Sequence, residues 1–331
     1  MSMSGAHKPR ICVLTAAGDA MLPGLDPLDG SAEIVHVDGE TDLARTLPET
    51  DVLVVTDFRT EALRRAWPNR HSIRWLHATS AGVDRLMFPE LVDSDVVVTN
   101  ARGVFDRGIA EYVLGAVLMF AKDTLTNVRL QQAHEWRHRE TELLVGRRAL
   151  VVGAGSIGRE VARLLRCVGM HVTATATAAR EDPSFDAVHA SEALPELLPE
   201  SDFVVITAPL TDATHGLFDE STFARMHPGA RLINVGRGPI VRTDALVNAL
   251  QEGRLGGAAL DVFETEPLDP ESPLWDMPNV MISAHMAGDF VGWERALGEQ
   301  FVANFQRWQR GEPLLNLVDK ARGYAQSSAT P

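Results

Sequence analysis

The sequence has little of what several protein classes require. It holds two cysteines in 331 residues, Cys12 and Cys167, and both have apolar neighbours, so we expect buried free thiols without a disulfide or a metal site. No apolar run reaches the roughly 20 residues of a membrane span. The first residues, MSMSGAHKPR, lack the apolar core of a secretion signal. These absences predict a cytoplasmic protein with no membrane partner.

Positive charge is also scarce, with 31 Lys and Arg against 45 Asp and Glu and a formal net charge of −14. Nucleic-acid-binding proteins carry a basic stripe, so this balance argues against a nucleic-acid partner. It is compatible with a local basic pocket for a small anion. A content of 45% hydrophobic and 23% charged residues is typical of a globular protein.

Short apolar runs alternate with helical segments along the chain, which indicates an α/β fold with parallel sheets. A first α/β unit has strands expected at 10–16, 33–38, 51–57, 73–79 and 95–100, with a helix at 60–67. A second unit has strands expected at 148–153, 171–176, 202–208, 230–236, 256–263 and 279–284.

Two further segments have strong helical patterns. Residues 104–121 are apolar on nearly every face, which predicts a helix buried all round, in a core or in an oligomer interface. Near 290–310, large apolar side chains recur every three or four residues and predict a helix with one buried stripe. The stripe consists of Trp293, Leu297, Phe301, Phe305 and Trp308.

The stretch GAGSIG at 153–158 follows an apolar strand and opens a helix with an apolar face. In this context Gly153 permits a tight turn, Gly155 lets the backbone approach a pyrophosphate, and Gly158 lets helix and strand pack closely. Together with Ser156 and Ile157 these glycines are expected to bind a dinucleotide at the helix N-terminus. The alternative is a glycine turn that only joins strand to helix.

The second strand of that unit ends in HVTATATAAR, without the acidic residue that usually binds the ribose of NAD. Ala176 removes the repulsion that an acid would exert on a 2′-phosphate. Thr175 and Thr177 offer hydroxyl donors, and Arg180 offers a charge-assisted hydrogen bond. We therefore expect NADP(H) to be favoured over NAD(H). If Arg180 points to water, the site is indifferent to the phosphate.

Three polar residues follow successive strands of the second unit, where ligands of open parallel sheets bind. Arg237 has the planar fork that suits a carboxylate. His285 is an acid–base group near neutral pH, and Glu266 would favour its protonated ring and fix its tautomer. Alternatively, none of the three has a catalytic role. Arg237 would then be a turn residue with its charge in solvent, Glu266 a solvated carboxylate, and His285 a buried histidine with its hydrogen bonds satisfied. As a set they predict reduction of a 2-keto acid.

The sequence resembles the D-isomer-specific 2-hydroxyacid dehydrogenase family over roughly residues 50 to 318. The resemblance rests on several motifs in the order and at the spacing of the family. They are TSAGVDRL (79–86), VTNARGVFDRGIAEYVLG (98–115), GAGSIGREVARLL (153–165), TAPLTDATHGL (207–217), INVGRGPIV (233–241), ALDVFETEPL (259–268), NVMISAHMAG (279–288) and GEPLLNLV (311–318).

This resemblance implies two Rossmann-like domains. A dinucleotide-binding domain, 101–286, would be inserted in a flavodoxin-like substrate-binding domain formed by 1–100 and 287–331, with substrate in the cleft between them. The implied reaction is NAD(P)H-dependent reduction of a small 2-keto acid to the D-2-hydroxy acid, with Arg237, Glu266 and His285 as the catalytic set. A homodimer through the 104–121 helix is also implied.

The resemblance also assigns roles to residues outside the catalytic set. Asp261 would hold the nicotinamide carboxamide, and the backbone of Ser80, Ala81 and Gly82 would offer N–H groups to the substrate carboxylate. The further cofactor contacts expected are Ala208 and Pro209, and the further substrate contacts are Phe58 and Arg59. Phe58 and Arg59 could equally pack or point to water.

The sequence departs from the family pattern at Ile109, where members often have threonine. Met286 and Phe290 suggest an apolar wall near the substrate or, alternatively, a place in the core. Other functions known in this family are a dinucleotide-sensing transcriptional regulator and a dehydrogenase of formate or phosphite. The sequence has no basic recognition segment and no extended N-terminal region, so we favour the keto acid reductase.

Overall fold

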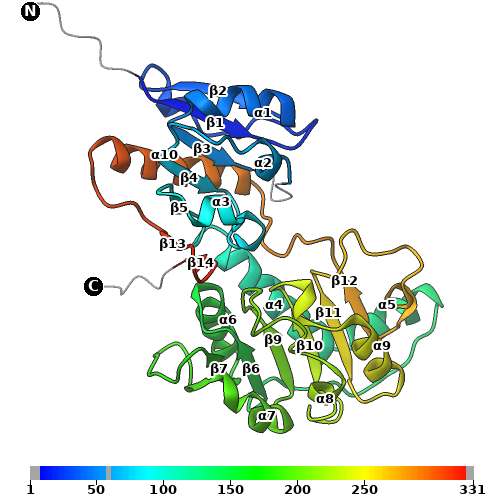
Figure 1. Cartoon of the computed structure of the whole chain (residues 1–331). Coiled ribbons are helices and arrows are strands. Elements are labelled where there is room, and N and C mark those ends of the chain that lie inside the picture. The colour runs from blue at the N-terminus through cyan, green and yellow to red at the C-terminus, as the bar shows by residue number, and fades with distance from the viewer. Residues whose placement is uncertain (1–7, 57–60, 326–331) are drawn as a thin grey trace, which may run out of the picture. The chain divides into compact units, whose positions relative to one another are not determined.

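The computed structural model describes residues 8–56 and 61–325, and the chain divides into two compact units (Figure 1). Unit 1 is formed by Met1–Phe105 and Phe290–Pro331, and unit 2 by Asp106–Asp289. Unit 2 is therefore one continuous segment inserted between the two parts of unit 1. These bounds differ by a few residues from those expected from the sequence.

Unit 1 is built on a five-stranded parallel sheet with the flavodoxin-like order β2-β1-β3-β4-β5 (Figure 1). Its strands are β1 (Arg10–Leu14), β2 (Glu33–Val37), β3 (Val52–Val55), β4 (Trp75–Ala78) and β5 (Val97–Thr99). The helices are α1 (Glu40–Thr46), α2 (Glu61–Ala66), α3 (Pro89–Val92) and α10 (Trp293–Gln309). A short antiparallel pair, β13 (Val318–Asp319) and β14 (Tyr324–Ala325), completes it.

The predicted stripe of α10 is confirmed as the side that faces the sheet. Phe301 and Phe305 are fully buried, and both rings stack on Trp75 of β4. Burial of such aromatic side chains removes large apolar areas from water, so this cluster anchors α10 to unit 1. The second part of the unit is thereby tied to the first.

A histidine lies inside this cluster. His77 of β4 is fully buried beside Phe301, and its Nδ1 is 2.8 Å from Thr99 Oγ1, which also accepts a hydrogen bond from Trp75 Nε1. The contact between His77 and Thr99 fits either tautomer of the neutral imidazole, because a hydroxyl can donate one hydrogen bond and accept two. Burial lowers the pKa of His77 to about 3. The ring is thus neutral in the folded protein at ordinary pH.

We expect His77 to make the stability of the protein depend on pH. Between about pH 6.5 and 3 the unfolded chain binds one more proton than the folded chain, because an unfolded histidine titrates near 6.5. The free energy of unfolding should therefore fall on acidification through this range, by up to about 1.4 kcal/mol per pH unit. Denaturant unfolding of His77→Phe should show a shallower fall. The exposed His227, replaced by glutamine, is the control, and equal slopes in the two variants would contradict the expectation.

Unit 2 is built on a seven-stranded parallel sheet of order β12-β11-β10-β9-β6-β7-β8. Its strands are β6 (Arg148–Val152), β7 (His171–Ala176), β8 (Ala187–Ala190), β9 (Phe203–Ile206), β10 (Arg231–Asn234), β11 (Gly257–Leu260) and β12 (Val280–Ile282). The helices are α4 (Asp106–Ala121), α5 (Thr124–Gln132), α6 (Ser156–Cys167), α7 (Leu194–Leu197), α8 (Glu220–Phe223) and α9 (Thr243–Gln251). The two sheets confirm the predicted fold class.

The two ends of unit 2 lie against each other. A β-carbon on Gly108, in the first turn of α4, would lie 2.8 Å from the carbonyl oxygen of Gly288. Only glycine fits this approach without displacing the backbone. The start of α4 and the segment that follows β12 are therefore packed backbone to backbone.

The helix 104–121 corresponds to α4, which packs against α6. Leu118 is 38% exposed and Glu111 and Gly115 also face solvent, so a place wholly inside a core is wrong, whereas burial of this face in an oligomer interface stays a prediction. Cys12 is buried as expected, with burial raising the pKa of its thiol to about 12. The expectation that Cys167 is buried is wrong, because this residue ends α6 on its exposed side. Within 8–56 and 61–325, no helix is long and apolar enough to cross a membrane.

Candidate active site

The glycine loop joins β6 to α6 as the sequence predicted. Gly153 has a φ of 113°, and a β-carbon there would lie 2.7 Å from the backbone nitrogen of Ala208. At Gly158 a β-carbon would lie 2.1 Å from the carbonyl oxygen of Gly153. Both positions therefore require glycine, for the turn and for close packing of helix on loop.

The space beside this loop fits a dinucleotide. A β-carbon on Gly155 would meet nothing within 4 Å, so the loop backbone is open to a ligand there. Ser156 and Ile157 form the first turn of α6, whose N-terminus favours a pyrophosphate. Ala208 and Pro209 follow β9, the strand beside β6 where the strand order reverses. Ligands of doubly wound sheets bind at such a point.

Arg180 lies beside the same loop. Its Nη2 donates a hydrogen bond of 2.6 Å to the carbonyl oxygen of Ala154, which holds the guanidinium beside the glycine loop, although the side chain remains 38% exposed. Thr177 is exposed at the end of β7, whereas Thr175 is only 3% exposed and in register with Val152. The hydroxyl of Thr175 is therefore a poor candidate for a ribose contact.

A second arginine in this region was not anticipated. Arg159 follows Gly158 directly, and its Nε donates a 2.7 Å hydrogen bond to Asp182 Oδ2, which lies 3.9 Å from Arg180 Nη2. Burial opposes ionisation of Asp182, but hydrogen bonds from Arg159 and Ser184 outweigh it and lower the pKa of its carboxyl. The sequence feature that could have indicated this second cation is an arginine directly after the glycine loop. The Asp182 carboxylate thus lies between the guanidinium groups of Arg159 and Arg180, in the loop after β7.

The structure brings His285 and Glu266 together. His285 Nδ1 lies 2.9 Å from Glu266 Oε2, and Glu266 Oε1 accepts a hydrogen bond of 3.1 Å from the backbone N–H of Phe263. The His285 side chain is 36% exposed. Because Nδ1 contacts the carboxylate, Nε2 is the other ring nitrogen through which the imidazole can exchange a proton.

Arg237 lies in the loop that follows β10. Its Nη1 donates to the carbonyl oxygen of Gly236 at 3.0 Å. A β-carbon on the following residue, Gly238, would lie 1.8 Å from the carbonyl oxygen of Phe263. The arginine loop is thus pressed against the backbone that also holds Glu266. The three predicted catalytic residues thus follow β10, β11 and β12 at the carboxyl edge of the sheet, where His285 and Glu266 are in contact.

Asp261 holds the turn that carries His285. The backbone N–H of His285 donates to the Asp261 carbonyl oxygen at 2.8 Å, and those of Met286 and Ala287 donate to its carboxylate oxygens at 2.9 Å each. Ser283 Oγ donates a further 2.5 Å hydrogen bond to Oδ1. Asp261 is 3% exposed.

His285 itself has a φ of 55°, in the left-handed region that costs a residue other than glycine on the order of 1–3 kcal/mol. The contacts with Asp261 compensate for this strain and fix the backbone from which the imidazole projects. The expected role of Asp261 toward a nicotinamide carboxamide stays a prediction.

The predicted substrate residues belong to unit 1. Ser80 Oγ donates to the carbonyl oxygen of Gly82 at 2.7 Å, and the carbonyl oxygen of Ala81 accepts from Asn100 Nδ2 at 2.5 Å, so 80–82 form a tight turn after β4. Phe58 and Arg59 lie outside the described residues. Met286 and Phe290 are 52% and 40% exposed, which excludes a core role for either. Ile109 is buried on α4.

A doubly wound sheet with a dinucleotide loop and a histidine–glutamate pair at its strand ends defines a class, the nicotinamide-dependent oxidoreductases. The family model "D-isomer specific 2-hydroxyacid dehydrogenase, NAD binding domain" matches residues 114–287. A glyoxylate reductase of Thermofilum pendens is 30% identical over 317 residues, which are 90% of this chain and 91% of that protein.

Two solved structures are similar over nearly the whole chain. A D-isomer specific 2-hydroxyacid dehydrogenase from Xanthobacter autotrophicus, in complex with NADPH and MES, has a TM-score of 0.80 at 31% identity and covers 95% of this chain and 99% of its own. An NADPH-dependent glyoxylate/hydroxypyruvate reductase from Sinorhizobium meliloti, in complex with NADP and sulfate, has a TM-score of 0.83 at 27% identity and covers 96% and 100%. The chain belongs to the D-isomer-specific 2-hydroxyacid dehydrogenase family.

Proposed function

We propose that the protein reduces a small 2-keto acid to the D-2-hydroxy acid with NADPH. The observation that carries this proposal is the 2.9 Å contact between His285 Nδ1 and Glu266 Oε2, beside Arg237 in a dinucleotide-binding unit. The reduction needs a cation that binds the substrate carboxylate, a group that donates a proton to the keto oxygen, and a site for the dinucleotide. The D configuration of the product is an expectation from the family.

In the proposed mechanism, the Arg237 guanidinium binds the substrate carboxylate through two parallel hydrogen bonds. The protonated His285 ring donates the Nε2 proton to the keto oxygen as negative charge develops there. Glu266 accepts the Nδ1–H of that ring, so it holds the imidazole in one orientation and stabilises its positive charge until the proton is transferred. The nicotinamide, when bound, supplies the hydride.

The family resemblance assigns further residues to this reaction. Gly153, Gly155, Gly158, Ser156 and Ile157 would hold the pyrophosphate. Ala208 and Pro209 would line the cofactor site on its β9 side, and Asp261 has a second oxygen, Oδ2, that accepts the Ala287 N–H and can take a carboxamide hydrogen as well. Ser80, Ala81 and Gly82 would bind the substrate carboxylate through their backbone, and Phe58 and Arg59 would shape selectivity.

A direct assay tests the proposed reaction. Purified protein should oxidise NADPH in the presence of glyoxylate, hydroxypyruvate, pyruvate or a longer 2-keto acid, and chiral analysis should find the D product. Background rates with every one of these acids, with both NADPH and NADH, would refute the reductase. A matrix of kcat/KM values over the two cofactors and the acids would also identify the preferred substrate.

The preference for NADPH rests on Arg180 and its surroundings. Arg180 is held at the glycine loop, Arg159 lies across Asp182 from it, and no acid ends β7. A 2′-phosphate would gain charge-assisted hydrogen bonds there. The structures from X. autotrophicus and S. meliloti contain NADPH and NADP, respectively.

Replacing Arg180 by alanine should therefore raise the Kd for NADPH about 10- to 100-fold, since a hydrogen bond to a charged group contributes about 1.5–3 kcal/mol. The Kd for NADH should change little, because it has no 2′-phosphate. Fluorescence titration measures both constants without turnover. Arg163→Ala, on the exposed side of α6, is the matched control. Equal losses for NADPH and NADH would show that Arg180 does not read the phosphate.

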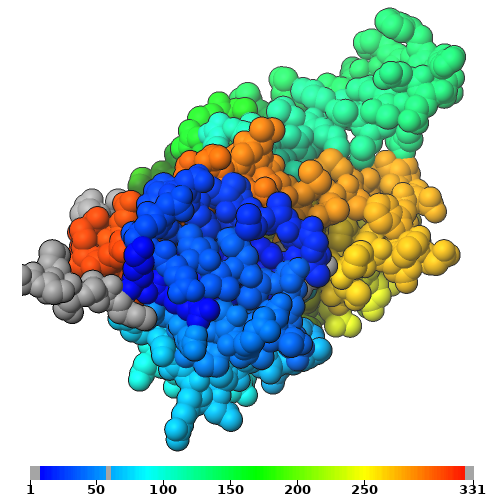
Figure 2. All heavy atoms as spheres, turned by 90° about the horizontal axis from the view of Figure 1, so that it is seen from above, coloured from blue at the N-terminus to red at the C-terminus, as the bar shows by residue number. Residues whose placement is uncertain are grey.

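A homodimer is proposed from the apolar surface that unit 2 exposes on α4, α5 and the segment 133–146. Trp136 is fully exposed, Leu143 and Val145 are more than 70% exposed, and Val128 of α5 is 46% exposed. In Figure 2 the green-teal segment around α5 stands out from the rest of its unit. Large exposed apolar patches mark interaction sites, and a second copy of the chain is the occupant that we propose.

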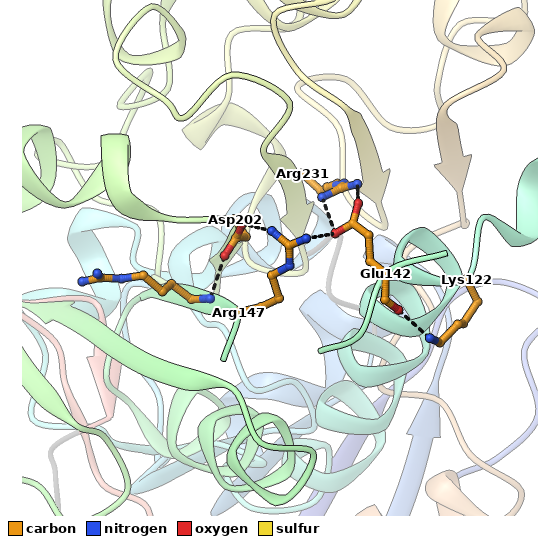
Figure 3. A network of polar contacts seen from close by, with 6 residues as sticks. Lys122, Glu142, Arg147, Asp202 and Arg231 are labelled. Carbon is orange, nitrogen blue, oxygen red and sulfur yellow. Dashed lines mark hydrogen bonds and ion pairs between the residues drawn. The ribbon is translucent and has the colours of Figure 1, made fainter. Parts of the chain in front are cut away.

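A polar network fixes the end of this segment to the sheet (Figure 3). The Glu142 carboxylate pairs with Arg231 at the start of β10 and lies 3.1 Å from Arg147 Nη2, while Arg147 Nη1 is 2.9 Å from Asp202 Oδ1. Lys122 Nζ donates to the carbonyl oxygen of Glu142 at 2.5 Å. The exposed side chains of 133–146 are thus presented from an anchored base.

A further inference from the structure

We propose that Tyr112 is a positioning residue for His285, acting through Ser283 and Asp261. This inference rests on the proposed function, because it takes His285 as the proton donor. Tyr112 is on α4, and its hydroxyl lies 2.7 Å from Ser283 Oγ although 171 positions separate the two residues. Nothing in the local sequence around either residue indicates this contact.

The direction of the hydrogen bonds follows from the number of hydrogens available. Ser283 has one hydroxyl hydrogen and donates it to Asp261 Oδ1 at 2.5 Å, because a carboxylate oxygen only accepts. Ser283 Oγ must therefore accept from Tyr112, which is the donor. The chain runs from the Tyr112 hydroxyl through Ser283 to the Asp261 carboxylate.

The carboxylate at the end of this chain determines where His285 sits. Asp261 accepts hydrogen bonds from the three consecutive N–H groups of 285–287, two of them at its carboxylate. Rotation of the carboxylate would release the N–H groups of Met286 and Ala287. The left-handed backbone of His285 would then lose the contacts that compensate for its strain. The hydroxyl of Ser283 opposes that rotation, and Tyr112 fixes the hydroxyl.

Two further observations support this role. Burial raises the pKa of Tyr112 to about 12, so its hydroxyl remains a donor throughout the pH range in which the protein would work. Gly108, one helical turn before Tyr112, packs against the backbone of Gly288. Helix α4 thus contacts both ends of the segment 283–288. Gly108 packs against Gly288 at one end, and Tyr112 makes a hydrogen bond with Ser283 at the other.

Tyr112→Phe tests the proposal, because it removes one hydroxyl and keeps the ring. Loss of a single hydrogen bond of this kind should lower kcat about three- to tenfold, with the Kd for NADPH unchanged. Amide hydrogen exchange in a peptide that covers 283–287 should become faster. Tyr324→Phe is the matched control, since Tyr324 is the only other tyrosine and belongs to unit 1.

Variants of Ser283 complete the test. Ser283→Thr retains the hydroxyl and should behave as the natural protein, whereas Ser283→Ala should lower kcat, and adding Tyr112→Phe to it should have little further effect. Unchanged exchange of 283–287 in Tyr112→Phe would overturn the proposal, as would a loss of NADPH binding. The exchange measurement needs no substrate, so it decides the role of Tyr112 even if no keto acid is reduced.

Discussion

Replacement of His285 by glutamine is expected to lower kcat by about 10²- to 10⁴-fold, the range attributed to general acid–base catalysis. Glutamine keeps a polar side chain of similar length, but it cannot transfer a proton to the keto oxygen. The imidazole projects from the strand-end turn, and Nδ1 is bound to Glu266, so Nε2 is the atom whose loss matters. Steady-state kinetics with the best keto acid measures the effect.

Cofactor binding serves as the internal control for this variant. His285 contacts Glu266 and the Asp261 backbone, whereas the glycine loop follows a different strand, β6. The Kd for NADPH, measured by fluorescence titration, should therefore stay within about twofold of the natural value because the dinucleotide site is independent of this ring. If NADPH binding is lost while turnover per bound cofactor is retained, His285 is misassigned.

Replacement of Arg237 by lysine should lower kcat/KM for the keto acid by about 10- to 100-fold, because it loses one of two charge-assisted hydrogen bonds, each of which contributes about 1.5–3 kcal/mol. Lysine keeps the positive charge but lacks the planar fork that binds both oxygens of a carboxylate. The backbone of the arginine loop is fixed by the approach of Gly238 to Phe263, so it cannot shift to accommodate the shorter reach of the new geometry.

The loss should be found in both KM and kcat, because Arg237 both binds and orients the acid. Arg225→Lys, on the surface after α8, is the control for a change of arginine to lysine elsewhere in unit 2. An Arg237→Lys enzyme with natural kcat/KM would show that another group binds the carboxylate. Added guanidinium ion should restore part of the activity of Arg237→Ala but not that of His285→Gln.

The sequence was sufficient to predict the strands that form the middle of both sheets, because their apolar runs are buried on two faces. It did not reveal β8, whose sequence AVHA is short and only partly apolar, nor the pair β13 and β14. The exposure of Cys167 was also unexpected. Apolar neighbours predict burial only when they share its side of the helix, and the fully buried Leu165 lies on the opposite side of α6.

The catalytic residues could be predicted because each follows a strand, and parallel strands end at one edge. Their supports could not be predicted, since they join distant parts of the chain. Tyr112 meets Ser283 across 171 positions, and Asp261 binds N–H groups about 25 positions away. Hydroxyl and backbone contacts of this kind leave no periodic pattern. The Arg159–Asp182 pair is similarly hidden, because it depends on how the loop after β7 folds back to α6.

The close approach of Gly108 and Gly288 makes unit 2 suitable for transfer into another protein. Unit 2 is one uninterrupted segment of the polypeptide, and the two ends of this segment lie next to each other. A module with adjacent ends can be transplanted as a cassette into another host domain at a single surface loop. Domain insertions are tolerated where the two ends of the inserted domain lie close together.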